Sequence, residues 1–334
     1  MYKRNRIAVV VPAYNEEGFV GEVIETVPSF VDRIYPVDDC SGDGTWLEIK
    51  QTAMRMNRIE PEAIRGRHEA MTDGGATPTV VPMRHDENRG VGGAIKTGYR
   101  EAMSDDVDVV AVMNGDGQMD PAVLDRILDP VVEGKAAYAK GNRLLSSDHW
   151  DGMSRWRLFG NVILTGLTRI ASGYWRMTDP QNGYTAISVD ALQQLNLDAM
   201  YERYGFLNDM LIRLNVHDMR VADVEMSAVY GDESSSIQYT EFVPRLSWLL
   251  LLGFVWRLRK RYASGERLVA VPYLAGVLGG PLFLASLAVS LPVLDGGLTR
   301  SESVVGLVAC VLLIATGIVM ERQRSERLET TVRK

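Results

Sequence analysis

Short apolar runs rich in β-branched residues alternate with longer amphipathic stretches through the first part of the chain. The apolar runs are typical of buried strands, and the stretches between them have the periodicity of helices. The expected strands are residues 7–14, 32–39, 79–86 and 107–117, and the expected helices are residues 16–30, 44–56, 92–103 and a short segment from Pro121. This alternation predicts βαβ units, an α/β fold with a mostly parallel sheet, and ligands bound at the carboxyl ends of the strands.

The pattern changes towards the end of the chain, where long apolar runs replace the alternation. Residues 268–293 carry no charged side chain and, as a helix, exceed the roughly 30 Å hydrocarbon core of a bilayer. Residues 304–320 are equally apolar and would span about 25 Å. Residues 241–267 mix tryptophans and leucines with a basic end, which is typical of a helix at the headgroup level. A buried core helix for 304–320 and a third, kinked span for 241–267 remain as alternatives.

These runs divide the chain into an α/β domain at residues 1–240, a juxtamembrane amphipathic helix at 241–267, two transmembrane helices at 268–320 and a cytoplasmic tail at 321–334. Basic residues precede the first span and follow the second: Arg257, Arg259, Lys260, Arg261 and Arg267, then Arg322, Arg324, Arg327, Arg333 and Lys334. Only Arg300 lies between the spans. Because cytoplasmic loops carry the excess of Lys and Arg, we expect a multi-pass protein of the cell membrane with both termini and the α/β domain in the cytoplasm.

Overall charge and cysteine content narrow the range of functions. The formal net charge of −7 argues against a nucleic-acid partner. Cys40 lies in a polar turn and Cys310 in an apolar run, so these two cysteines build no disulfide framework. This cysteine content is consistent with a protein domain in a reducing compartment.

Polar residues follow each expected strand, at 14–17, 38–39, 88–90 and 114–118. One such cluster would be ordinary turn chemistry, but a cluster after every strand indicates a site at one edge of the sheet. The last cluster offers carboxylate and amide oxygens with no side-chain bulk at its glycines, which suits a hard divalent cation. Asp116 is its only charged ligand. We therefore expect metal and a diphosphate to bind together.

Several motifs, in a fixed order, carry a family resemblance: VVPAYNEEG (10–18), VDDCSGDGTW (37–46), NRGVGGAIKTGY (88–99), NGDGQMDP (114–121) and DPQNGYTAIS (179–188). This series resembles the family 2 inverting glycosyltransferases, in particular the branch of dolichyl-phosphate mannose synthase and the polyprenyl-phosphate glycosyltransferases. The resemblance covers roughly residues 6–240 and implies a GT-A (Rossmann-like) catalytic domain. It also implies a nucleotide-diphosphate sugar donor and Mg²⁺ or Mn²⁺ as cofactor.

The resemblance also implies roles for single residues. The residues implied to bind the donor are Pro12, Tyr14, Glu16, Asp39, Asn88 and Gly115, and those implied to surround metal and diphosphate are Asn114, Asp116 and Gln118. The chain departs from the family pattern at two positions. Asn114 stands where the metal motif commonly begins with Asp, and Cys40 replaces a usual Gly.

A basic and aromatic segment between residues 140 and 170 is the expected acceptor side; its members include Arg143, Arg155, Arg157, Arg169, Trp150, Trp156 and Phe159. Guanidinium groups bind phosphate bidentately, and tryptophans favour the membrane interface. By resemblance, Arg143 and Arg157 would hold a polyprenyl phosphate; a solvated basic helix face is the alternative. A phosphate acceptor is already anionic, so it needs no strong base. Asp209 occupies the place of the base in relatives with hydroxyl acceptors, and it remains a candidate base or orienting group.

The sequence therefore predicts a membrane-anchored, inverting, metal-dependent hexosyltransferase. Its donor would be GDP-mannose or a UDP-sugar, and its acceptor would be a dolichyl or other polyprenyl phosphate. The protein would be surrounded by membrane lipids. One alternative keeps the donor and transfers the sugar to a hydroxyl of a lipid or lipid-linked saccharide. A lower-ranked alternative is a non-catalytic nucleotide-sensing or lipid-translocating subunit. A processive polysaccharide synthase is disfavoured, because the Gln-x-x-Arg-Trp element of that class is absent from the sequence.

Overall fold

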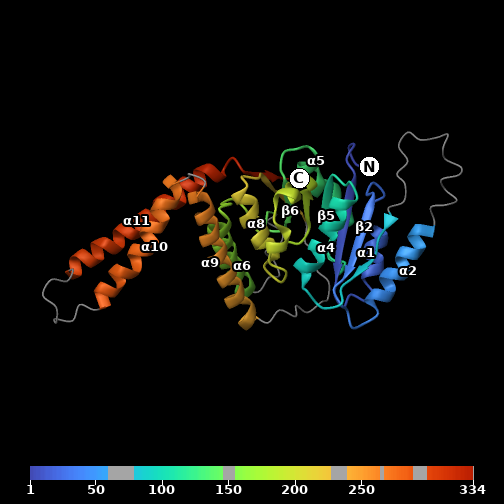
Figure 1. Ribbon diagram of the computed structural model, residues 1–334, viewed down its shortest axis with the longest axis horizontal. Coiled ribbons are helices and arrows are strands. Elements are labelled where there is room, and N and C mark those ends of the chain that lie inside the picture. Colours follow the sequence, from blue (N-terminus) through green and yellow to red (C-terminus); the bar gives the residue numbers. More distant parts are fainter. Residues whose placement is uncertain (59–78, 146–154, 227–238, 264–266, 289–298, 334) are drawn as a thin grey trace.

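The computed structural model describes residues 1–58, 79–145, 155–226, 239–263, 267–288 and 299–333 (Figure 1). Its described strands form one sheet in the order β3-β2-β1-β5-β7-β6-β8-β9, with β4 also beside β2. The strands are β1 (Ile7–Ala13), β2 (Arg33–Asp38), β3 (Thr79–Val80), β4 (Met83–Arg84), β5 (Val109–Val112), β6 (Tyr138–Asn142), β7 (Thr185–Ser188), β8 (Val221–Glu225) and β9 (Glu329–Val332).

The sheet is mostly parallel, as the alternation of strands and helices predicted. β1 pairs in parallel with β2 and with β5. β7 is antiparallel to both of its neighbours, β5 and β6, while β6 and β8 are parallel to each other. The polar segments after β1, β2, β4 and β5 therefore end at one edge, where a parallel sheet binds its ligands.

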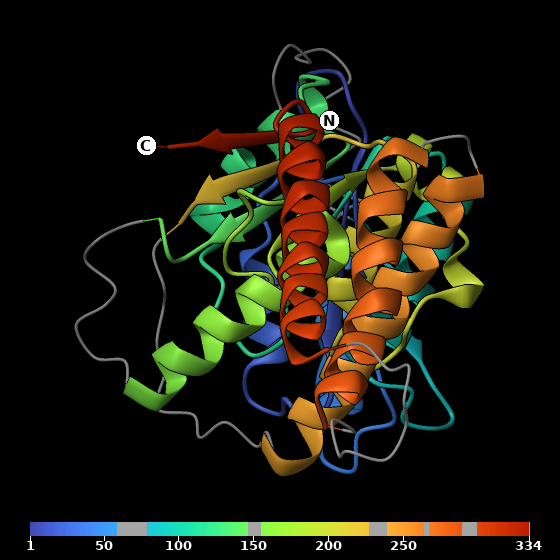
Figure 2. The ribbon, with the colours of Figure 1, turned by 90° about the vertical axis from the view of Figure 1, so that its left-hand side faces the viewer.

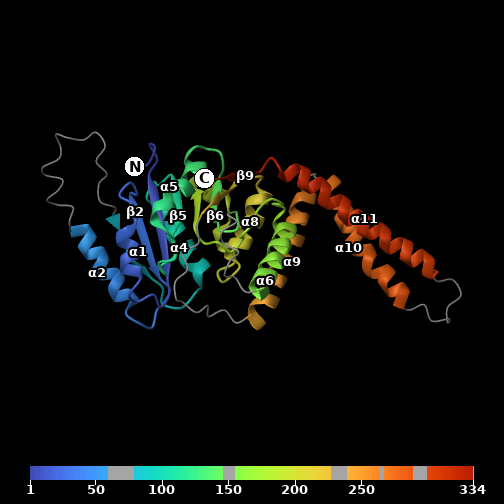
Figure 3. The same cartoon turned by 180° about the vertical axis from the view of Figure 1, so that it is seen from behind.

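Helices cover both faces of this sheet (Figures 1 and 3). They are α1 (Val20–Thr26), α2 (Thr45–Arg58), α4 (Val91–Ser104), α5 (Leu124–Val132), α6 (Arg155–Ser172), α7 (Val189–Gln194) and α8 (Phe206–Val216), with short 3₁₀ turns at Pro121–Val123 and Leu197–Ala199. Alternate residues of β1 point to opposite faces. Ile7 and Val9 join the core under α1, α2 and α5, whereas Ala8 and Val10 join the core under α4, α7 and α8.

Three long helices follow the sheet domain: α9 (Tyr239–Ala263), α10 (Arg267–Ala288) and α11 (Arg300–Ser325). α9 packs against α6 and α8 through the buried Leu246 and Leu250. α10 and α11 pack side by side and extend away from the sheet (Figures 1 and 2). Among the described residues, α11 is the one helix long and apolar enough to cross a membrane, and the apolar part of α10, Val271–Leu287, is shorter.

The end of the chain differs from the predicted cytoplasmic tail at 321–334. α11 continues to Ser325, and Glu329–Val332 form β9, which extends the sheet in parallel beside β8. The chain thus leaves the sheet domain for the apolar hairpin and returns to it. The β-branched residues of this last segment fit a strand, but its pairing partner lies too far away in the sequence for local reading to find.

A buried ion pair joins the base of the hairpin to the sheet domain. Arg257 of α9 is fully buried and pairs with Glu321 of α11, to which the hydroxyl of Tyr273 of α10 also donates, at 3.0 Å. Arg257 Nε and Nη2 donate to the carbonyls of Ala171 and Ile170, at 2.8 and 2.9 Å. These carbonyls belong to the last turn of α6, where the helix itself supplies no donors.

Arg261 of α9 is also buried and contacts Asn215 of α8. Both Arg257 and Arg261 were counted among the basic residues that set membrane orientation. In the structure these two side chains are bound to protein groups, so they do not contribute to a basic flank that faces lipid.

Candidate active site

The segments after β1 and β2 are tied together by hydrogen bonds between side chains and backbone. The N–H of Asn15 donates to Ser41 Oγ at 2.9 Å, and the N–H of Gly42 donates to Asn15 Oδ1 at 2.9 Å. One residue on, the N–H of Glu16 donates to Thr45 Oγ1 at 2.8 Å. Tyr14 stays half exposed on this framework. Its ring face is therefore accessible at the edge where a ligand would bind.

Pro12 and Gly115 hold the ends of β1 and β5 close together. Pro12 is buried, and its carbonyl accepts the N–H of Gly115 at 3.1 Å. A Cβ at Gly115 would lie 3.2 Å from Ala13 Cβ and from the Pro12 carbonyl oxygen. The close approach of the two strands explains why glycine fits here.

Asp39 organises the loop after β4. Its Oδ1 accepts the N–H of Arg89 at 2.9 Å, and its Oδ2 accepts the N–H of Gly90 at 2.7 Å. His85 Nδ1 also lies 2.7 Å from Oδ1, and the Asp39 carboxylate is almost wholly buried. Asn88 precedes these residues in the same loop. A role of Asp39 towards base or ribose stays a prediction; the structure shows a carboxylate that already accepts hydrogen bonds from its own protein.

The turn after β5 contains a partly buried carboxylate, Asp116. Its Oδ1 accepts the N–H of Gln118 at 3.0 Å. Burial raises the pKa of Asp116 above its ordinary value, and hydrogen bonds from Gln118 and from the side chain of Asn114 offset part of that rise. No positive charge of a described residue contributes to this balance. A cation at Asp116 would therefore be favourable.

The donor set of this turn suits a hard divalent ion, since it combines one carboxylate with the amide side chains of Asn114 and Gln118. Among the described residues, no group of three or more His, Cys, Asp or Glu side chains could hold a metal. One protein carboxylate is nevertheless sufficient for an ion that takes its other ligands from water and a diphosphate.

Arg143 and Asp179, which lie in two separate sequence motifs, form a bidentate pair. Nε and Nη2 of Arg143 each donate to the Asp179 carboxylate at 2.8 Å. Burial alone would raise the pKa of Asp179, but the hydrogen bonds and charge of Arg143, together with Lys140, lower it below its ordinary value. The Arg143 side chain is 40% exposed. The side chain of Arg157, its predicted partner, lies outside the described residues.

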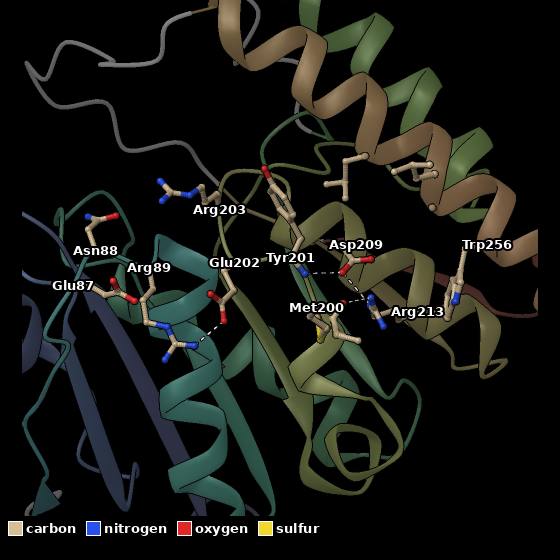
Figure 4. A pocket seen from close by; sticks show the side chains of 14 residues that line it. Glu87, Asn88, Arg89, Met200, Tyr201, Glu202, Arg203, Asp209, Arg213 and Trp256 are labelled. Atoms are coloured by element: carbon tan, nitrogen blue, oxygen red, sulfur yellow. Dashed lines mark hydrogen bonds and ion pairs between the residues drawn. The ribbon is translucent and has the colours of Figure 1, made fainter.

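Asp209 lines a pocket of about 670 Å³ between the loop after β4, the start of α8 and the side of α9 (Figure 4). Its Oδ2 accepts the N–H of Tyr201 and Nε of Arg213, both at 2.9 Å. Arg213 in turn stacks on Trp256 of α9, 5.2 Å from the ring centroid. The pocket includes Asn88 but none of residues 114–118.

Several organising residues were not predicted from the sequence: His85, Lys96, Glu202, Asp223, Arg257 and Glu329. His85 follows β4 at the same edge as the other polar clusters, so its position was a usable signal. Lys96 is buried in the middle of α4 and pairs with Glu202 at 2.8 Å. Such pairs join residues far apart in sequence, and no local pattern indicates them.

Comparison with known proteins decides the family. Residues 8–195 match the family described as Glycosyl transferase family 2. The chain belongs to this family. It is therefore a glycosyltransferase, as the sequence motifs implied.

Two known glycosyltransferases resemble most of this chain. It is 27% identical over 229 residues to the UDP-N-acetylglucosamine–dolichyl-phosphate N-acetylglucosaminyltransferase of Methanococcus voltae, which covers 68% of this chain and 87% of the relative. It is 26% identical over 237 residues to the undecaprenyl-phosphate mannosyltransferase of Micrococcus luteus, which covers 67% of this chain and 84% of the relative.

A solved structure confirms the GT-A fold. It is the crystal structure of glucosyl-3-phosphoglycerate synthase from Mycobacterium tuberculosis in complex with Mn²⁺, UDP and glucosyl-3-phosphoglycerate. The TM-score is 0.51 at 18% identity, over 76% of this chain and 80% of that one. At this identity the likeness concerns the fold alone.

Proposed function

We propose that this glycosyltransferase transfers one sugar from a nucleotide-diphosphate donor to a polyprenyl phosphate. One observation carries the proposal: the two relatives carry different sugars in their names, yet both names contain a polyprenyl phosphate. The shared feature is the acceptor, and each match spans at least 84% of the relative. UDP-N-acetylglucosamine and GDP-mannose are both donors to test.

On the donor side, Tyr14 and the loop that Asp39 organises would bind the nucleotide. Asp116, with Asn114 and Gln118, would hold Mg²⁺ or Mn²⁺; the structure of glucosyl-3-phosphoglycerate synthase described above contains Mn²⁺ together with UDP. The metal would supply positive charge to the leaving diphosphate. Burial raises the pKa of Asp116, and no positive charge of a described residue is among the causes of this shift, so a metal cation would stabilise the ionised carboxylate.

On the acceptor side, Arg143 would bind the lipid phosphate while Asp179 holds its guanidinium in place, and Arg157 would assist from α6. The phosphate oxygen attacks the anomeric carbon, and the bond from that carbon to the diphosphate breaks with inversion. Since the acceptor is already anionic, no base is needed, and catalysis rests on positioning and charge. Asp209, held by Arg213 and the N–H of Tyr201, would orient rather than deprotonate.

The apolar helices would place this site at the membrane. α11 and the shorter apolar part of α10 would form a membrane hairpin, with the sheet domain and both termini in the cytoplasm. α9 would lie at the headgroup level. Exposed apolar side chains support this arrangement: on α9, Val243, Trp248, Leu251, Leu252 and Val255; on α10, Val277, Leu278 and Leu282; on α11, Val305, Val311 and Leu312.

The test is to incubate the purified full chain with labelled UDP- and GDP-sugars, polyprenyl phosphate, and Mg²⁺ or Mn²⁺. We expect label in the organic phase, in a product that survives mild base and is cleaved by mild acid, as a glycosyl monophosphate is. If the label stays in the aqueous phase with every donor, the proposal is refuted and the non-catalytic alternative is favoured.

A second acceptor class follows from the pocket around Asp209. Because this carboxylate lines a pocket beside Asn88, a hydroxyl acceptor could meet a base there. On that alternative, Asp209→Asn abolishes transfer and Arg143→Ala is harmless. The proposed function predicts the opposite ranking of the two variants.

A further inference from the structure

The end of the chain folds onto the segment that leads into Asp179. We call residues 325–332 the C-terminal segment. Ser325 Oγ donates to the carbonyl of Gly173, and Glu326 forms an ion pair with Arg176 at 3.0 Å. Glu329 contacts the next stretch, and β9 then pairs with β8. The residues directly after α11 therefore lie against residues 173–177.

Glu329 makes the most specific of these contacts. Its Oε1 accepts the N–H of Trp175 at 2.8 Å, and its Oε2 accepts the N–H groups of Arg176 and Met177 at 2.6 and 3.0 Å. Hydrogen bonds to a carboxylate are stronger than neutral ones. Three consecutive N–H groups on one carboxylate fix the direction of this backbone. The pairing of β9 with β8 covers the edge of the sheet whether or not residue 329 is a glutamate. Covering this edge therefore does not explain the three hydrogen bonds that the Glu329 carboxylate accepts.

The fixed backbone continues directly into the Arg143 site. The N–H of Thr178 donates to Asp223 Oδ2 at 3.0 Å, and Asp223 is a residue of β8 that pairs with Thr331 of β9. Asp179 follows with φ of 48°, a left-handed conformation that non-glycine residues seldom adopt. Such a conformation persists only where the surroundings hold it. Asp179 then binds Arg143 through both carboxylate oxygens.

We propose that the C-terminal segment, through Glu329, is a positioning element of the active site that sets the Asp179–Arg143 pair. It joins the apolar hairpin to the acceptor side, because α11 ends at the residue where the segment begins. The substrate that Arg143 meets rests on the proposed function, whereas the positioning itself does not. Glu329 is a positioning residue: it acts through residues 175–179.

The test compares Glu329→Gln with Glu326→Gln in the full chain. Both variants remove one negative charge from the same short segment, but Glu326 makes only an exposed ion pair, which contributes little. We expect Glu329→Gln to lower kcat/KM for the polyprenyl phosphate by about 100-fold, the cost of misplacing a reacting group by about 1 Å. The KM for the donor should stay unchanged. Glu329→Asp, which keeps the charge, should recover part of the loss.

A second readout does not depend on activity. Amide hydrogen exchange of residues 173–180 should be faster in Glu329→Gln than in Glu326→Gln, with equal exchange in α1 and α2. Equal acceptor kcat/KM in the two variants would overturn the inference, as would equal losses for donor and acceptor. If the wild-type chain transfers no sugar to polyprenyl phosphate, the proposed function fails, and the exchange comparison alone decides the positioning role.

Discussion

The proposed donor side and the proposed acceptor side of this glycosyltransferase are built in different ways. On the donor side, the segments after β1, β2, β4 and β5 hold one another through contacts such as Asn15 with Ser41 and Asp39 with Gly90. On the acceptor side, Arg143 meets Asp179, and Glu329 from the end of the chain contacts Trp175 just before Asp179. The proposed donor side is therefore built within the first 120 residues, whereas the proposed acceptor side also receives contacts from the returning end of the chain.

The largest effect on activity should follow from Asp116→Ala. Transfer should fall by about a thousandfold, since the variant removes the carboxylate proposed to hold the metal ion, whose positive charge would stabilise the leaving diphosphate. Asp120→Ala is the matched control, because Asp120 is exposed and only caps the next turn by accepting the N–H of Ala122 at 2.9 Å. The control should cost about 1 kcal/mol of stability and keep its activity. Equal activities of the two variants, measured as initial rates at saturating donor, would break the donor-side account.

The largest effect on stability should follow from Glu321→Gln at the base of the hairpin. It leaves the buried Arg257 without its anionic partner, so the free energy of unfolding should fall by about 3 kcal/mol. A double variant, Arg257→Met with Glu321→Leu, should recover most of the loss. Denaturant unfolding in detergent measures both. An unchanged midpoint for Glu321→Gln would show that the ion pair does not hold the hairpin.

The contributions of Asp179 and Asp116 to stability should change in opposite directions with pH. Asp179 has a lowered pKa, so it contributes stability above its unfolded pKa of about 3.9 and loses it as pH falls through the folded value. Asp116 has a raised pKa, so its stabilising contribution is lost as pH rises above about 3.9 towards the folded value. At pH 7, Asp179→Asn should therefore cost about 2 kcal/mol, and Asp116→Asn should stabilise the metal-free protein. Melting curves of both variants at pH 4 and pH 7 test these two predictions. A metal-free Asp116→Asn variant that melts below the wild-type chain at pH 7 would contradict the prediction for Asp116.

The smallest effect should follow from Trp248→Ser on α9. This side chain is 61% exposed, and its loss should lower activity on vesicle-embedded acceptor by about threefold, with no change in detergent. Leu47→Ser on α2 is the control, since Leu47 is 56% exposed on the sheet domain. If the two variants lose the same amount of activity in vesicles, α9 does not lie at the lipid headgroups.

The sequence predicted the fold class and the position of the polar clusters at one edge of the sheet, because each rests on a contiguous pattern; the donor-binding role of these clusters stays a prediction. β-branched runs predict buried strands, and motifs at strand ends converge when the strands are parallel. The same reasoning could not find β9, since a strand is defined by a partner, and β8 lies far away in the sequence. It also counted Arg257 among the basic residues that indicate membrane orientation, because its burial beside Glu321 depends on how α6, α9 and α11 pack. The membrane-spanning arrangement of α10 and α11 remains a prediction.

The most direct test of the acceptor assignment offers the protein two lipids that differ only in the phosphate, polyprenyl phosphate and polyprenol, with the same labelled donor and Mn²⁺. We expect that label enters the organic phase with polyprenyl phosphate alone, and that Arg143→Ala removes most of that signal. Label on polyprenol, lost in Asp209→Asn and kept in Arg143→Ala, would contradict it.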